Sequence, residues 1–117
     1  MPDTSPNRSK TDPATFEVVK NSLLKAAEEM KIVLAKTAYS PLLKMAGDYS
    51  CGIFSAPGDM VAQGPDLPIH LGSMPDAVRS VVQTFPEPKE GEVYIHNDPY
   101  HGGSHLPDVN VVMPAFF

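Results

Sequence analysis

Residues 12–38, DPATFEVVKNSLLKAAEEMKIVLAKTA, decide the first element of the fold. Apolar residues recur along them at intervals of three and four, at Phe16, Val19, Leu23, Ala27, Met30, Val33, Leu34 and Ala38. This spacing predicts a long helix with one apolar stripe. Asp12 is placed to cap the helix, and Pro13 suits its first position, where no N–H is needed. Pro41 ends it, because the residue before a proline is pushed out of the α region.

The charged residues of this stretch lie away from the apolar stripe. They are Lys20, Lys25, Glu28, Glu29, Lys31 and Lys36. The simplest interpretation is a solvated or subunit-facing surface.

The residues after the helix predict a hairpin, a second helix and two more strands. Residues 48–55 resemble a strand, and residues 60–63 resemble the strand that returns beside it. Residues 56–59 between them resemble a turn, because Pro57 and Gly58 match the central positions of a type II turn. Residues 64–71 are expected to be loop. Ser73, with Asp76 three residues on, predicts the start of a helix from about residue 74 to 85. With strands over 93–96 and 109–113, the fold class is α+β.

Composition limits what the chain can be. At 117 residues it fits one domain, and no apolar run approaches the ~18 residues of a membrane-spanning helix. A net charge of −5 argues against a nucleic-acid partner. Residues 1–11 are polar and are expected to form a disordered lead-in, and we expect a cytoplasmic protein. Cys51 has no partner cysteine within the chain, and an inert buried thiol is the favoured interpretation over a nucleophile.

The segment from His96 to Asp108 is the richest in reactive groups, with three imidazoles and two carboxylates in thirteen residues. Such groups suit a borderline divalent ion: Zn²⁺, Fe²⁺ or Mn²⁺. Spacing alone leaves two pairs open as the core of a site, His105 with Asp108 and His96 with Asp98. Gly102-Gly103 makes a helix that would align His101 with His105 improbable.

Ordinary turn chemistry explains some of the same residues. Asn97-Asp98-Pro99 is a good turn initiator, so Asp98 could simply cap the loop. His70, between Ile69 and Leu71, is more typical of a half-buried structural histidine than of a ligand.

Several motifs together carry a family resemblance. They are Asp12-Pro13, Glu28-Glu29-Met30, Thr37-Ala38-Tyr39-Ser40-Pro41, Asp48-Tyr49-Ser50-Cys51, Val61-Ala62-Gln63, His70-Leu71-Gly72-Ser73-Met74, Asn97-Asp98-Pro99-Tyr100, and Gly102-Gly103-Ser104-His105-Leu106-Pro107-Asp108-Val109. In these the chain resembles the N-terminal part of a hydantoinase B-type subunit. That family comprises ATP-dependent hydantoinases, 5-oxoprolinases, and acetone and acetophenone carboxylases. Family members are several times longer, so the resemblance covers a leading fragment, residues 12–117, of a larger mixed α/β subunit.

The resemblance implies an activity and partners. It implies part of the metal-binding subunit of an ATP-dependent amidohydrolase that opens hydantoin, 5-oxoproline or another lactam or cyclic imide. ATP and Mg²⁺ are expected on a hydantoinase A-type ATPase partner, and the remainder of the subunit, or a complementary chain, is a second expected partner. The alternatives are a fragment of an ATP-dependent ketone carboxylase, or a non-catalytic assembly piece that docks on a partner subunit.

The resemblance also assigns residues. It implies divalent-metal ligands at Asp48, His105 and Asp108, with a further histidine expected beyond residue 117. Asn97 and Asp98 are interpreted as loop-shaping or substrate-side residues, and His70 is a further substrate-binding candidate. No ligand role is carried onto His101, where the family usually has another residue.

Two expectations concern the isolated chain. It should lack independent activity. It should also associate or aggregate, because Phe116 and Phe117 follow an apolar strand.

Overall fold

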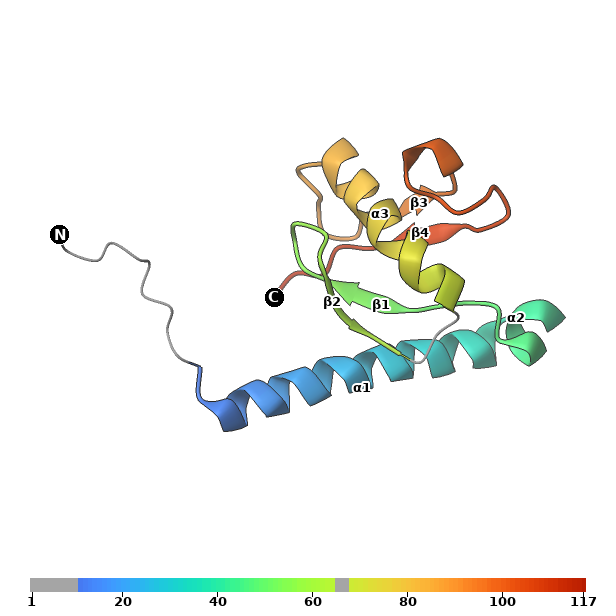
Figure 1. Ribbon diagram of the computed structural model, residues 1–117. Helices are drawn as coiled ribbons and strands as arrows, with labels where there is room; N and C mark the ends of the chain where they lie inside the picture. Colours follow the sequence, from blue (N-terminus) through green and yellow to red (C-terminus); the bar gives the residue numbers. More distant parts are fainter. Residues whose placement is uncertain (1–10, 65–67) are drawn as a thin grey trace.

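The computed structural model describes residues 11–64 and 68–117, except for the side chains of residues 68–71. Its elements are α1 (Pro13–Thr37), α2 (Pro41–Ala46), β1 (Gly52–Phe54), β2 (Met60–Gln63), α3 (Pro68–Thr84), β3 (Tyr94–His96), the short 3₁₀ helix η1 (Pro99–His101) and β4 (Asn110–Val112). The chain is therefore mixed α and β with a long N-terminal helix, as predicted (Figure 1). Nearly all of the predicted lead-in lies outside the described residues.

The predicted first helix is confirmed at both ends. The Asp12 carboxylate accepts a hydrogen bond from the Thr15 N–H at 3.1 Å, and Pro13 occupies the first turn. The helix ends at Thr37, and Ala38 is extended. Its apolar stripe is only partly covered, because Ala27 is buried whereas Phe16 and Val33 are more than half exposed.

A short helix, α2, was not predicted. Pro41 ends α1 as expected but also begins α2, since proline fits the first position of a helix as well as it terminates one. Gly47 follows in the left-handed conformation, with φ 65°, and ends the helix.

The predicted hairpin is present, with a shorter first strand. β1 pairs antiparallel with β2, but it covers only Gly52–Phe54 rather than residues 48–55, and its register shifts between Ile53 and Phe54. Gly58, at φ 94°, lies in the turn, and the Ser55 N–H donates to the Asp59 carbonyl at 2.8 Å. The Pro-Gly turn thus sets the hairpin, whereas the residues before β1 remain irregular.

The start of the second helix was predicted wrongly. α3 begins at Pro68, so residues 68–71 of the expected loop are helical, and residues 65–67 lie outside the described part. Ser73 is inside the helix instead of capping it. Pro68 takes the first position, as Pro13 and Pro41 do in the other helices. Pro75 stays within α3 at the loss of one backbone hydrogen bond.

Two small antiparallel sheets organise the packing (Figure 1). The predicted strands over 93–96 and 109–113 are present as β3 and β4, with Ile95 opposite Val111. α1 packs on the β1–β2 hairpin, and α3 packs on β3 and β4. The Arg79 guanidinium joins the two groups of elements by an ion pair with Asp59 at 3.3 Å.

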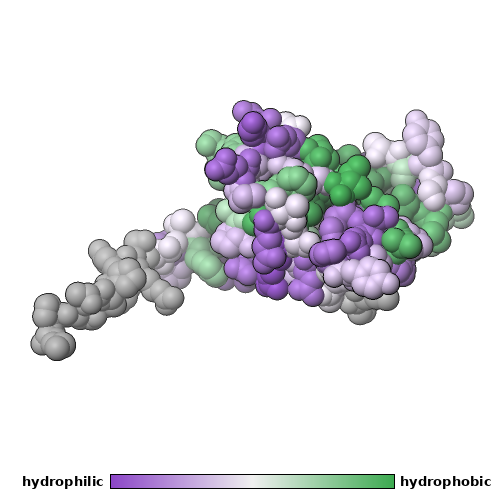
Figure 2. All heavy atoms as spheres, turned by 90° about the horizontal axis from the view of Figure 1, so that it is seen from above, coloured by the Kyte–Doolittle hydropathy of each residue, from purple (hydrophilic) through white to green (hydrophobic). Residues whose placement is uncertain are grey.

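The buried core of the described residues consists of small side chains. Its members are Ala27, Ala62, Ala77, Val78 and Val81. Many larger apolar side chains are exposed, and Figure 2 shows them gathered on part of one face beside polar ones. In the described part of the chain, no helix is long and apolar enough to cross a membrane.

Candidate functional site

The β3–β4 connection, residues 97–109, sits tightly against α3. Gly102 has φ 92°, and a Cβ atom built there would lie 2.7 Å from both the carbonyl carbon and the carbonyl oxygen of Asp76. A Cβ at Gly103 would lie 2.7 Å from the Asp98 carbonyl oxygen. Gly102 is therefore needed where the loop approaches the backbone of α3, and Gly103 where the loop backbone returns close to Asp98.

Asp98 and His101 form the closest acid–imidazole pair in the loop. Nδ1 of His101 lies 2.6 Å from Oδ2 of Asp98, while Oδ1 accepts the Tyr100 N–H at 2.9 Å. These two hydrogen bonds, that of His101 first, hold the pKa of Asp98 below its usual range. Asp98 thus caps η1, as the turn interpretation predicts, and also binds an imidazole. Sequence reasoning missed this pair, although the three-residue spacing across Pro99 was a usable signal.

His96 holds the main chain of the same turn. Its Nε2 lies 2.9 Å from the His101 carbonyl oxygen, so Nε2–H is the donor. Its Nδ1 is buried and has no hydrogen-bond partner among the described residues. In the structure His96 and Asp98, the second pair left open as the core of a site, each contact His101.

His105 and Asp108 lie together on the other side of the loop. Nδ1 of His105 is 3.7 Å from Oδ1 of Asp108, and the Ser104 hydroxyl donates to Oδ2 of Asp108. Nearby, the Asn97 amide donates to the Leu106 carbonyl at 3.0 Å, which ties the two ends of the loop together. Asn97 therefore has a loop-shaping contact, one of the two roles expected for it.

The three residues assigned to a metal do not form one group. Within residues 11–64 and 68–117, no three His, Cys, Asp or Glu side chains lie close enough to hold an ion. His105 and Asp108 are neighbours, whereas Asp48 lies between α2 and β1, where its N–H faces the Leu42 carbonyl at 3.5 Å. One imidazole and one carboxylate are the right donors for Zn²⁺, Fe²⁺ or Mn²⁺ but fall short of the three or more protein ligands of such sites. The His70 side chain is outside the described part.

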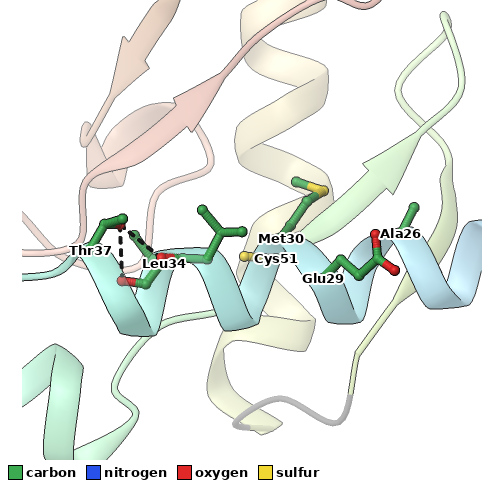
Figure 3. A pocket seen from close by; sticks show the side chains of 7 residues that line it. Ala26, Glu29, Met30, Leu34, Thr37 and Cys51 are labelled. Carbon is green, nitrogen blue, oxygen red and sulfur yellow. Dashed lines mark hydrogen bonds between the residues drawn. The ribbon is translucent and has the colours of Figure 1, made fainter.

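Of two hollows in the described part of the chain, the larger is remote from the loop. It is a shallow apolar groove of about 600 Å³ along α1, lined in part by Met30, Leu34 and Cys51 (Figure 3). Cys51 is half-buried rather than fully buried. The smaller hollow, of about 270 Å³, lies between α3 and the loop, where His96, Asp98 and His101 meet Val81 and Phe85. The smaller one brings a carboxylate and two imidazoles together beside apolar side chains.

Comparison of the chain with known proteins identifies its family. The family model for hydantoinase B/oxoprolinase matches residues 12–117. The chain is 40% identical over 109 residues to a 5-oxoprolinase of Dictyostelium discoideum, with 92% of this chain and 9% of that protein covered. It is 42% identical over 107 residues to caprolactamase subunit beta of Pseudomonas jessenii, with 91% and 18% covered.

A protein of Methanocaldococcus jannaschii without an assigned function is 43% identical over 110 residues, covering 91% of this chain and 20% of its own length. The chain therefore spans a fifth or less of the length of these relatives. The match includes α1, the hairpin, α3 and the whole loop from His96 to Asp108. The chain belongs to the hydantoinase B/oxoprolinase family.

Proposed function

We propose that this chain forms part of the metal-binding subunit of an ATP-dependent amidohydrolase that opens a cyclic amide. The observation that carries the proposal is the alignment of residues 12–117 with the family, two of whose members are named for 5-oxoproline and caprolactam. Both compounds are lactams, so the names favour hydrolysis over the ketone carboxylation that the family resemblance also allows. An A-type ATPase partner would supply ATP and Mg²⁺, and the subunit name of the caprolactamase supports a multi-subunit enzyme.

His105 and Asp108 are the proposed metal ligands in this chain. Their contact at 3.7 Å supports the assignment, and the Ser104 hydroxyl orients the Asp108 carboxylate. Asp48 would complete the set only on assembly, together with a further ligand from outside the chain. When bound, a Zn²⁺, Fe²⁺ or Mn²⁺ ion supplies a Lewis acid at the amide carbonyl. Asn97 acts here by joining the loop ends, which keeps His105 beside Asp108.

Manganese line broadening tests the ligand pair without requiring activity. Adding Mn²⁺ in small amounts to the ¹⁵N-labelled full chain should broaden the amide signals around residues 104–108, because a paramagnetic ion affects nuclei near it even when binding is weak. His105→Ala should abolish this broadening. The matched control is His101→Ala, which removes an imidazole of the same loop and should leave it intact. Broadening that survives in His105→Ala would refute the assignment.

Exposed apolar surface favours a second role, docking on the rest of the enzyme. Side chains alternate between the two faces of the sheet along β3, β4 and the residues that flank them. One face is left bare, and its side chains are each more than half exposed: Val93, Ile95, Val109, Val111 and Met113. α3 covers the opposite face. A bare apolar face of this kind marks an interaction site, and we assign it to the remainder of the subunit or to a complementary chain.

Sedimentation velocity checks the docking role. At micromolar concentration the chain should sediment faster than a monomer, and Ile95→Lys with Val111→Glu should restore the monomer, because the two residues are cross-strand partners at the centre of the bare face. The control pair is Lys20→Glu with Glu17→Lys, which reverses an exposed ion pair on α1. A clean monomer before mutation would contradict the expectation.

A further inference from the structure

We propose that His101, held by Asp98, is a proton acceptor for amide hydrolysis, beside a hollow that takes the ring of the cyclic amide. The inference rests on the proposed lactam hydrolysis but not on the metal ligands. It assigns a chemical role to a histidine for which the family resemblance implied none.

The hydrogen bond to Asp98 selects the reactive nitrogen of His101. Nδ1 lies 2.6 Å from the Asp98 carboxylate, so Nδ1 carries the proton and the lone pair of the neutral ring is at Nε2. The side chain is 71% exposed, which leaves Nε2 open to water and substrate. A carboxylate on the far nitrogen also stabilises the imidazolium that forms once Nε2 accepts a proton.

The main chain of His101 is held in place from two directions. Nε2–H of His96 donates to the His101 carbonyl at 2.9 Å, and the His101 N–H donates to the Asp98 carbonyl at 3.2 Å. Gly102, the next residue, is pressed against the backbone of α3 at Asp76. An imidazole on a restrained turn keeps its direction, which is what proton transfer at a fixed position needs.

The hollow beside His101 matches a small cyclic amide. Val81 of α3 and Phe85, which directly follows that helix, give it an apolar wall, and His96, Asp98 and His101 give it a polar one. Its volume of about 270 Å³ lies just below the usual range of ligand pockets, about 300–1,000 Å³, which suits a small ring. Methylene groups would contact α3 while the amide faces the imidazoles.

The proton transfer acts on the ATP-activated amide of the proposed function, whose oxygen carries a phosphoryl group. Nε2 of His101 takes a proton from water as the water oxygen bonds to the amide carbon. The carbon–nitrogen bond then breaks, and the proton held on His101 passes to the departing nitrogen. The ring opens to an amine and an acyl phosphate, which a second water cleaves to a carboxylate and inorganic phosphate, and His101 returns to its neutral form.

Histidine NMR tests the positioning by Asp98. In the full chain labelled with ¹⁵N-histidine, at a pH where the rings are neutral, His101 should be the Nδ1–H tautomer, the minor form of a free imidazole. Asp98→Asn should return it to the ordinary Nε2–H form. Asp59→Asn, a carboxylate paired with Arg79 on the hairpin, is the matched control and should change nothing. A His101 ring in the Nε2–H form in the unaltered chain would overturn the proposal.

Ester hydrolysis tests the proton transfer on the same protein. Although the chain is not expected to open a lactam on its own, it should hydrolyse p-nitrophenyl acetate, an activated acyl probe that needs no ATP, and His101→Asn should lower the rate by at least about tenfold. Asparagine keeps an N–H donor for Asp98 but removes Nε2, so the loop should stay folded. Caprolactam should slow the reaction by occupying the hollow. An unchanged rate in His101→Asn would refute the role of His101, and no effect of caprolactam would refute the hollow. Because neither measurement involves a metal, loss of the manganese result alone would leave this inference standing.

Discussion

Gly102→Ala should destabilise the chain through one identifiable contact. The new Cβ would lie 2.7 Å from two backbone atoms of Asp76, closer than real Cβ contacts, and backbone on both sides leaves little freedom to move. The positive φ of 92° costs an alanine about 1–2 kcal/mol, and relieving the overlap costs about 1–3 kcal/mol more. The loop should therefore lose about 2–5 kcal/mol of its stability.

Gly91→Ala separates these two contributions. Gly91 has a similar φ of 84° but has nothing within 4 Å of a built Cβ, so it carries the dihedral cost alone. In thermal unfolding followed by circular dichroism, Gly102→Ala should melt about 4–12 °C below Gly91→Ala, the equivalent of about 1–3 kcal/mol in a domain of this size. Equal melting temperatures would show that the loop does not sit against α3 as described.

Three further changes probe other parts of the molecule. Asp12→Ala removes the cap of α1 and should cost about 1 kcal/mol in urea unfolding. The pKa of Asp98 is lowered in the folded chain, so the ionised carboxylate stabilises the fold above its ordinary pKa of 3.8. This stabilisation is lost as the pH falls through the pKa of the folded state, and Asp98→Asn should weaken the loss of stability at acid pH. The Tyr94 pKa is raised, chiefly by its hydrogen bond to Glu92, so its stabilisation is present below pH 10 and lost at higher pH; in ultraviolet titration, Glu92→Gln should lower that pKa.

The sequence predicts most clearly those elements that local chemistry controls. The apolar spacing, Asp12 and Pro13 predict α1 almost to the residue, and the Pro-Gly turn predicts the hairpin. At Pro41 and Pro68 the prediction missed the start of a helix, because proline was interpreted as a residue of helix ends and loops although it also suits the first position of a helix. Ser73 has the capping chemistry, but the helix already runs through it.

The site was less predictable because spacing does not give direction. His105 and Asp108 were one of two open pairs, and the structure brings them to 3.7 Å. The glycines after His101 argue against a helix over 101–105, but η1 ends before them and turns His101 back onto Asp98. The position of Asp48 relative to the loop depends on contacts between distant elements, which no local pattern encodes.

The division of the fold into two groups of elements bears on how the chain folds. α1, α2 and the hairpin are consecutive, as are α3, β3, η1 and β4, and most packing lies within each group. Contacts between residues near in sequence lower the entropy lost on closing loops, so each group should form quickly and on its own, on the fast side for a mixed domain. The Arg79–Asp59 ion pair joins the two groups and should form late, so removing it should speed unfolding while leaving the folding rate nearly unchanged.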